Sequence, residues 1–422
     1  MNIELTRKLQ GAIELLLESA SRINEAKPQR YWYPLSMAAY GAEEIIEALD
    51  SMCNFRTTMW EKTRMFEGLF AQFQGSPHAI MVNSGSSADL LLSFLLVSPP
   101  DGILRPGDTV LVPAVTWPTH IWSILMAGLN VRLVDVDPET LNLSLEDLER
   151  KAKPPAKALF LVHIMGNPCP MDSVLEIARS RNLVLLEDCC EALGSEWNGR
   201  KVGTFGLGSS FSFFFSHHMT TMEGGMITVG DPLLADRLRV LRAHGWLRNV
   251  DSADFASLAG YDVDPRYAFV GWGFNVRPTE LQAGFGLCQI EKLPRFNERR
   301  VSLGERFYSF VEGCEFLRKP RVAPGAKSVW MALPVLVDRG APFRRGDLTL
   351  YLEEAGVETR PIVTGNIARQ PAAKMFPAFR EGRCPGADIV HEQGFYLGLS
   401  PLTADQDMDR LIELLADFVK RY

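Results

Sequence analysis

Residues 158–194 read ALFLVHIMGNPCPMDSVLEIARSRNLVLLEDCCEALG and describe one strand–helix–strand unit. The segments ALFLVHI from Ala158 and LVLLED from Leu183 are almost continuously apolar, and the helix-like stretch DSVLEIARSRN lies between them. Apolar strands that alternate with helices are typical of a parallel sheet covered on both faces. The unit therefore predicts an α/β fold, with Asp188 at the carboxyl end of a buried strand.

The same alternation continues on both sides of this unit. Five more short apolar runs are strand candidates: AIMV from Ala79, TVLVPA from Thr109, VRLVDV from Val131, SFSFFF from Ser210 and MITV from Met226. Together they predict a mostly parallel, seven-stranded sheet. We assign this sheet to a large domain over residues 31–294, followed by a smaller α/β domain over residues 295–422. An amphipathic pattern over residues 3–20 predicts that residues 1–30 form a helical extension.

Composition narrows the class of protein. The 422 residues carry a net charge of -7 and no basic run, which disfavours nucleic-acid binding. Seven scattered cysteines without a C-x-x-C pair favour a reducing compartment and offer no spacing typical of a metal site. The chain shows neither a signal-peptide pattern nor an apolar run long enough to span a bilayer. We therefore expect a cytoplasmic protein without a metal or a membrane partner.

A phosphate-binding turn is predicted at NSGSSADLLL from Asn83, which follows a strand and opens a helix. Gly85 allows a tight turn, and Ser86 and Ser87 place hydroxyls and free amides in the first helical turn. An ordinary strand-to-helix turn with a serine cap would have the same sequence. The motif alone therefore leaves both interpretations open.

Three side chains near strand ends could hold a flat heterocycle. Asp188 could pair with a protonated pyridine nitrogen, and Glu191 could reach the phenolic oxygen of the same ring. Trp117, in PAVTWPTH, could stack on the ring. A helix-capping aspartate and a core tryptophan are the alternatives.

The order of these features, followed by SFSFFFSHHMTTMEGGM from Ser210, resembles the DegT/DnrJ/EryC1/StrS sugar aminotransferase family of fold type I pyridoxal phosphate enzymes. In most of that family, a lysine that follows S-F-x-x-[ST] binds the cofactor covalently. Aligning the pair that begins with Ser212 places His217 at the position of that lysine. No lysine occurs between Lys201 and Lys292, so a shifted register cannot restore one.

The chain also resembles a subgroup of this family, the nucleotide-sugar 3-dehydratases. The resemblance lies in His217–His218 followed by EGG, in GFNVRPTELQ from Gly273 and in TRPIVTGNIARQP from Thr359. It implies non-covalently bound pyridoxamine phosphate, with Ser212 among the cofactor-binding residues.

The reaction implied by this subgroup starts from a 4-keto-6-deoxy sugar bound to a nucleotide. His217 would remove a proton from the C4′ carbon of the cofactor, and the C3 hydroxyl of the sugar would leave. The products would be ammonia and a 3-deoxy-4-keto sugar. L-Glutamate would then restore the amine form of the cofactor and leave as 2-oxoglutarate.

One branch of the subgroup carries an iron–sulfur cluster on cysteines that follow a segment matching RAHGW from Arg242. The corresponding stretch here, LRNVDSADFASLAGYDVDP over residues 247–265, contains no cysteine. We therefore expect neither a cluster nor a reductase partner. The chain resembles the cluster-free branch, whose substrate is GDP-4-keto-6-deoxy-D-mannose.

Four further residues carry roles implied by the resemblance. Asn275 would reach the cofactor phosphate of a partner subunit, which predicts a homodimer with shared active sites. Arg277 could grip the carboxylate of glutamate, although a surface ion pair is the alternative. Arg360 and Arg369 could meet the sugar diphosphate, or they could simply be solvated.

Three other functions remain open. The chain could carry out the same chemistry on a nucleotide sugar outside the GDP-mannose series. It could be a lysine-less binding or regulatory homologue without turnover, although Asp188, the phosphate turn and EGG are all retained. A true aminotransferase would need a distant lysine in the cofactor pocket, and none is well placed.

Overall fold

The computed structural model describes residues 3–25, 30–98, 102–248, 250, 263–376 and 383–422. Most of the cysteine-free stretch after RAHGW, residues 249 and 251–262, lies outside this range.

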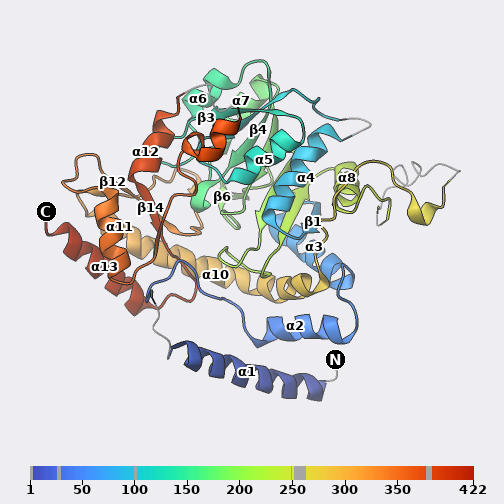
Figure 1. The fold of residues 1–422 in the computed structure, drawn as a ribbon, viewed down its shortest axis with the longest axis horizontal. Helices are drawn as coiled ribbons and strands as arrows, with labels where there is room; N and C mark the ends of the chain where they lie inside the picture. Colours follow the sequence, from blue (N-terminus) through green and yellow to red (C-terminus); the bar gives the residue numbers. More distant parts are fainter. Residues whose placement is uncertain (1–2, 26–29, 99–101, 249, 251–262, 377–382) are drawn as a thin grey trace.

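A seven-stranded sheet forms the centre of the large domain (Figure 1). The strand order is β1 (His78–Val82), β9 (Gly225–Val229), β8 (Gly208–Ser212), β5 (Val184–Asp188), β4 (Ala156–Val162), β2 (Thr109–Pro113) and β3 (Asn130–Val134). The ladders from β8 to β3 are parallel, whereas β9 runs antiparallel to both of its neighbours. The predicted α/β fold with a mostly parallel, seven-stranded sheet is confirmed.

Helices cover both faces of this sheet, as its near-continuous apolar strands require. On one face, the apolar core joins the strands to α4 (Gly85–Val97), α5 (Pro118–Met126) and α8 (Pro232–Arg242). On the other face, two apolar clusters join them to α6 (Leu145–Lys151) and α7 (Met171–Ser180), and to α3 (Glu61–Gln74) and the long α10 (Glu280–Glu312). The parallel strands thus all end at one edge of the sheet, where ligands of open α/β folds bind.

The C-terminal part contains a four-stranded antiparallel sheet. Its order is β10 (Leu317–Arg318), β12 (Leu333–Val337), β14 (Gly394–Leu397) and β13 (Thr359–Pro361). The helices α11 (Arg345–Glu354), α12 (Pro385–Gln393) and α13 (Asp405–Val419) accompany it, and a third small sheet consists of β11 (Ala326–Lys327), β6 (Glu196–Trp197) and β7 (Arg200–Lys201). Helix α10 continues through Pro294 across the predicted domain boundary, so it contributes to both parts of the chain.

The N-terminal region is helical. Helix α1 (Ile3–Glu25) extends beyond the predicted residues 3–20 and packs against α2 (Ala42–Cys53), with Ile13, Ala42 and Ile46 in the contact (Figure 1). In the described ranges, none of the helices combines the length and the apolarity that crossing a bilayer requires.

The segment SFSFFF differs from its prediction as a single strand. Strand β8 ends at Ser212, and the next three residues begin the loop that leads to β9. Phe213 is buried, whereas Phe214 and Phe215 are 44% and 38% exposed. His217 and His218 therefore lie in the loop after β8 rather than on a strand. The sequence predicted too long a strand because phenylalanine is common in strands, although the run of three phenylalanines does not alternate with polar residues.

Candidate active site

The predicted phosphate turn forms the start of α4, directly after β1. Ser84 caps the helix, and its hydroxyl accepts the N–H of Ser87 at 3.1 Å. Gly85 and Ser86 open the first turn, where amides have no partner within the helix. A Cβ on Gly85 would lie 2.6 Å from the Cβ of Ser212, so only glycine allows α4 to begin this close to β8. The two predicted cofactor residues Gly85 and Ser212 are thus in contact.

Asp188 ends β5 and is 4% exposed. Its Oδ1 accepts the N–H of Cys190 at 2.7 Å, and its Oδ2 lies 2.8 Å from Nε2 of His120. Burial acts to raise the pKa of Asp188, but the His120 side chain holds it below its ordinary value. The carboxylate is therefore kept ionised at a buried position.

His120, on α5, lies between two buried carboxylates. Its Nε2 is 3.5 Å from Oδ2 of Asp89 and 2.8 Å from Oδ2 of Asp188. The N–H is not aligned with either oxygen, so the contact is mainly an ion pair. Burial acts to lower the pKa of His120, but the two carboxylates raise it to about 9. The imidazole is thus charged at neutral pH.

His217 is held next to this group by the backbone. Its Nδ1 lies 2.7 Å from the carbonyl oxygen of Cys190, to which it donates, and Arg300 Nη2 donates to the carbonyl oxygen of His217 at 3.1 Å. Because Nδ1 carries the proton, Nε2 is the basic nitrogen of the neutral ring. Burial lowers the pKa of His217, so its neutral form prevails near neutral pH.

Trp117 and Glu191 approach the same edge of the sheet. Trp117 is the N-cap of α5 and is 55% exposed, so it is not part of the core. Glu191 Oε2 accepts the N–H of Met165 at 2.7 Å, and burial raises the pKa of Glu191 to about 7. Glu191 can therefore serve as a neutral hydrogen-bond donor as well as a carboxylate.

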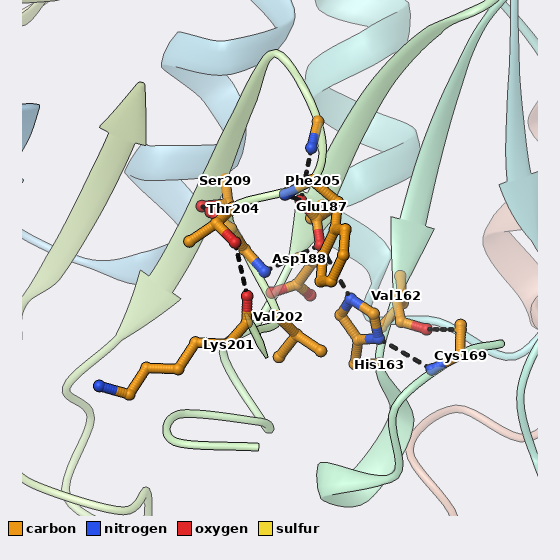
Figure 2. A network of polar contacts seen from close by, with 12 residues as sticks. Val162, His163, Cys169, Glu187, Asp188, Lys201, Val202, Thr204, Phe205 and Ser209 are labelled. Atoms are coloured by element: carbon orange, nitrogen blue, oxygen red, sulfur yellow. Dashed lines mark hydrogen bonds and ion pairs between the residues drawn. The ribbon is translucent and has the colours of Figure 1, made fainter. Parts of the chain in front are cut away.

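The residue before Asp188 anchors the strand from the other side, as Figure 2 shows. Glu187 accepts a hydrogen bond from Nε2 of His163, whose Nδ1 accepts the N–H of Cys169 at 3.0 Å. Its two oxygens also accept three backbone N–H groups, those of Gly203, Phe205 and Gly206. Glu187 is thus occupied by structural hydrogen bonds, and successive side chains on β5 point in opposite directions. This arrangement fixes Asp188 toward α4 and α5.

Asn275 and Arg277 line a cavity of about 820 Å³ together with residues from α3 and α8. Arg277 Nε donates to Asn275 Oδ1 at 2.9 Å. The lining of this cavity does not include Trp117, Asp188 or His217. Val276, which lies between Asn275 and Arg277, nevertheless contacts the phosphate turn. Its carbonyl oxygen accepts the N–H of Asn83 at 3.0 Å.

The two arginines of the C-terminal part have different surroundings. Arg360 pairs across the sheet with Tyr396, whose pKa is raised to about 12 by burial, with a smaller contribution from Glu191. Arg360 therefore stands near the candidate site, with an ion pair to Glu358 at 2.6 Å. Arg369 lies in a surface ion pair with Glu392 at 2.8 Å, which must open before this guanidinium can meet a diphosphate.

The segment that carries these arginines packs directly on the loop before Trp117. Thr364 Oγ1 donates to the carbonyl oxygen of Thr116 at 2.9 Å, and the N–H of Ile367 donates to the carbonyl oxygen of Ala114 at 2.9 Å. The C-terminal part is thus fixed beside the carboxyl ends of the parallel strands.

Comparison with known proteins agrees with this geometry. The model of the DegT/DnrJ/EryC1/StrS aminotransferase family matches residues 39–416. The chain belongs to this family. The prediction of the family from sequence is confirmed.

Three members of the family are similar over most of the chain. GDP-4-keto-6-deoxy-D-mannose 3-dehydratase from Yersinia pseudotuberculosis is 34% identical over 388 residues, which cover 91% of this chain and 98% of the relative. dTDP-4-dehydro-2,6-dideoxy-D-glucose 3-dehydratase from Saccharopolyspora spinosa is 33% identical over 92% of this chain and 86% of its own. A crystal structure of GDP-4-keto-6-deoxymannose-3-dehydratase with a trapped PLP–glutamate geminal diamine has a TM-score of 0.86 and 33% identity, covering 91% of this chain and all of the other.

The residues of this family member fit a pyridoxal-type cofactor. A buried carboxylate ends β5, an exposed indole stands two strands away, and Gly85 brings the start of α4 against Ser212 of β8. Gly85, Ser86 and Ser87 would hold the phosphate, Asp188 the ring nitrogen and Trp117 the ring face. In its amine form, the cofactor supplies an amino group for a ketone and an electron-withdrawing ring.

Three residues near the site were missed from sequence: Asp89, His120 and Arg300. His120 is the last residue of the quoted Trp117 motif, and Asp89 lies within the quoted phosphate-turn motif, in the helix that the turn opens. Each lies about one helical turn after a predicted site residue. This spacing places it on the same face of the helix and could have indicated that it lies near the site. Arg300 gave no such signal, because it reaches His217 from the middle of α10.

Proposed function

We propose that the chain is a nucleotide-sugar 3-dehydratase that uses non-covalently bound pyridoxamine phosphate and a GDP-linked 4-keto-6-deoxy sugar. The observation that carries the proposal is His217, at the position that the resemblance assigns to the cofactor-binding lysine of the family. Its Nδ1 is fixed on the carbonyl of Cys190, two residues from Asp188. Histidine cannot hold the cofactor as an imine, but it can move protons near neutral pH.

The pocket residues act by binding and orientation. The start of α4, with Gly85, Ser86 and Ser87, holds the phosphate, and Ser212 contacts it from β8. Asp188 keeps the ring nitrogen protonated, so that the ring can accept negative charge. Glu191, with its pKa raised to about 7 by burial, donates a hydrogen bond to the phenolic oxygen.

His217 performs the proton transfer. With pyridoxamine phosphate bound, the neutral Nε2 of His217 would take a proton at the C4′ carbon, and the C3 hydroxyl of the sugar would leave as water. Over the whole cycle, the 4-keto sugar and L-glutamate are consumed, and the 3-deoxy-4-keto sugar, 2-oxoglutarate and ammonia are formed. This sum balances, because the sugar loses one oxygen, 2-oxoglutarate and ammonia together contain one oxygen more than L-glutamate, and the water released and consumed over the cycle cancels.

Substrate contacts and assembly complete the proposal. Arg360 stands near Glu191 through Tyr396 and is a candidate for the sugar diphosphate, with Arg369 farther out. Asn275 and Arg277 face the 820 Å³ cavity, which would receive a second copy of the chain. In such a homodimer, Asn275 reaches the partner's cofactor phosphate and Arg277 binds the glutamate carboxylate. We place the enzyme in the cytoplasm, where nucleotide sugars are available.

A different nucleotide is the second candidate. The relative from S. spinosa is named for a dTDP-linked substrate. Its sequence identity to this chain, 33%, is nearly the same as the 34% of the relative named for a GDP-linked substrate. The chemistry would be unchanged, because the reacting groups belong to the sugar. Parallel assays with GDP-linked and dTDP-linked 4-keto-6-deoxy sugars decide between the two.

The proposal is tested with purified protein, pyridoxal phosphate and L-glutamate. We expect the absorbance of the aldehyde form to convert to that of the amine form. After addition of GDP-4-keto-6-deoxy-D-mannose, ammonia and 2-oxoglutarate should accumulate in equal amounts with the deoxygenated sugar. Conversion by glutamate without ammonia from this sugar would disprove the substrate. An amino sugar formed without ammonia would disprove the dehydratase function.

A further inference from the structure

A second buried carboxylate, that of Asp89 on α4, lies beyond Asp188. Its Oδ1 accepts the hydroxyl hydrogen of Ser210 at 2.7 Å, and its Oδ2 accepts that of Thr119 at 2.8 Å. The same Oδ2 lies 3.5 Å from Nε2 of His120. Asp89 is 2% exposed, so its charge is balanced by protein groups rather than by water.

Both ring nitrogens of His120 face oxygen atoms. Nε2 faces the carboxylates of Asp89 and Asp188, whereas Nδ1 lies 3.1 Å from the carbonyl oxygen of Trp117 and 2.6 Å from the hydroxyl of Thr116. A carbonyl oxygen only accepts hydrogen bonds, so Nδ1 needs a proton to bind it. Between two carboxylates, Nε2 needs one as well. The geometry therefore favours the doubly protonated imidazolium.

We propose that Asp89 is a positioning residue of the cofactor site, which supplies the charge for His120 so that Asp188 remains available to the ring nitrogen. This inference rests on the proposed use of a pyridine cofactor. Two carboxylates and one imidazolium leave one negative charge in the network. A protonated ring nitrogen neutralises that charge.

Without Asp89, two cations would share one buried carboxylate. An uncompensated buried charge is costly, so either His120 or the ring nitrogen would lose its proton. Loss from the ring nitrogen weakens the ability of the cofactor to accept charge. The other titratable side chains close to the network are Cys189, Cys190, Glu191 and His217. Burial raises the pKa of the two thiols and of Glu191 and lowers that of His217, which favours the neutral form of each.

The charge of His120 is measured by ¹⁵N NMR of the histidine side chains in cofactor-free protein. At pH 7.5 we expect an imidazolium in the parent protein and a lower titration midpoint in Asp89→Asn. A neutral His120 in the parent at this pH would overturn the proposal. The parent spectrum decides this point even if a variant does not fold.

The link to the cofactor is tested by titrating cofactor-free protein with pyridoxamine phosphate and following tryptophan fluorescence. Asp89→Asn should bind about tenfold more weakly, the equivalent of roughly one pKa unit at the ring nitrogen. The double variant Asp89→Asn/His120→Gln should recover to within about threefold of the parent, because it removes the competing cation. Asp147→Asn, which removes another buried carboxylate on α6, serves as the matched control and should bind like the parent.

The outcomes separate the two proposals. A purely structural role for Asp89 would make the double variant weaker than the single one, and this result would overturn the inference. Unchanged affinity in Asp89→Asn would overturn it too. Failure of the parent to bind pyridoxamine phosphate would instead contradict the proposed function.

Discussion

The imidazole of His217 is oriented by a backbone carbonyl, and the backbone of His217 is held in turn by the side chain of Arg300. Nδ1 donates to the carbonyl oxygen of Cys190, and Arg300 holds the carbonyl oxygen of His217 itself. This arrangement selects one tautomer and leaves Nε2 as the base. A lysine at this position would act as a nucleophile, so the exchange changes the chemistry without changing the surrounding fold.

The pH dependence of turnover follows from the state of His217. The neutral form is the base, and burial lowers its pKa below the ordinary 6.5. As the pH falls through that pKa, His217 becomes protonated, and kcat/KM should fall about tenfold per pH unit. A pH–rate profile from 4.5 to 9 measures this acid limb.

Glu191 is the control for this profile, because burial raises its pKa to about 7. In Glu191→Gln, the acid limb should stay below pH 6.5, while any inflection near pH 7 should disappear. If Glu191→Gln shifts the acid limb, the limb reports the titration of Glu191, and its assignment to His217 is contradicted.

Single residues were predictable where a motif carried them. Gly85, Asp188 and His217 stand in short patterns whose chemistry is local. The Asp89–His120–Asp188 network was not predictable, because α4, α5 and β5 meet only through the sheet order. Likewise, nothing in the sequence shows that Arg300 reaches the His217 loop.

At the scale of elements, the start of α4 is fixed by its contact with β8. An alanine at Gly85 would place its Cβ 2.6 Å from Ser212 Cβ and 3.1 Å from Cys190 Sγ, so the helix or the strand must move. We expect Gly85→Ala to destabilise the protein by about 1–3 kcal/mol and to weaken pyridoxamine phosphate binding. Chemical denaturation and a cofactor titration measure the two effects.

Gly346→Ala provides the matched control for this substitution. Gly346 lies in α11, and a Cβ there meets nothing within 4 Å. We expect this change to leave cofactor affinity unaltered and to leave stability equal or slightly higher. Equal behaviour of the two variants would show that the approach of α4 to β8 does not shape the phosphate site.

The strands were predictable because buried parallel strands are almost continuously apolar. The end of β8 was not, since Phe213 continues the apolar run into the core after the ladder has stopped. The predicted domain boundary after residue 294 falls inside helix α10, because the proline at position 294 is accommodated within the helix.

At the scale of the whole molecule, the two parts of the chain meet at the candidate site. The segment with Thr364 and Ile367 is hydrogen-bonded to the loop before Trp117. These bonds fix the segment that follows Arg360 relative to the loop that carries Trp117. Asn275 and Arg277 instead face the cavity beside α3 and α8. The proposed homodimer would place these two side chains in the second active site.

Shared active sites are tested by mixing two inactive variants, His217→Asn and Asn275→Ala. A mixed dimer has one site with both changes and one with neither, so activity should recover to about a quarter of the parent level. The control mixes His217→Asn with Asp188→Ala, two changes in the same subunit's site, and should show no recovery. Mixed dimers of the first pair without activity would contradict a shared site.

The most direct test of the account is a single turnover without L-glutamate. Protein loaded with pyridoxamine phosphate is mixed with GDP-4-keto-6-deoxy-D-mannose, and ammonia is quantified after rapid quenching, for the parent and for His217→Asn. We predict one ammonia per bound cofactor in the parent, and almost none in a variant that still binds the cofactor. Full ammonia release by His217→Asn would contradict the role of His217 as the base.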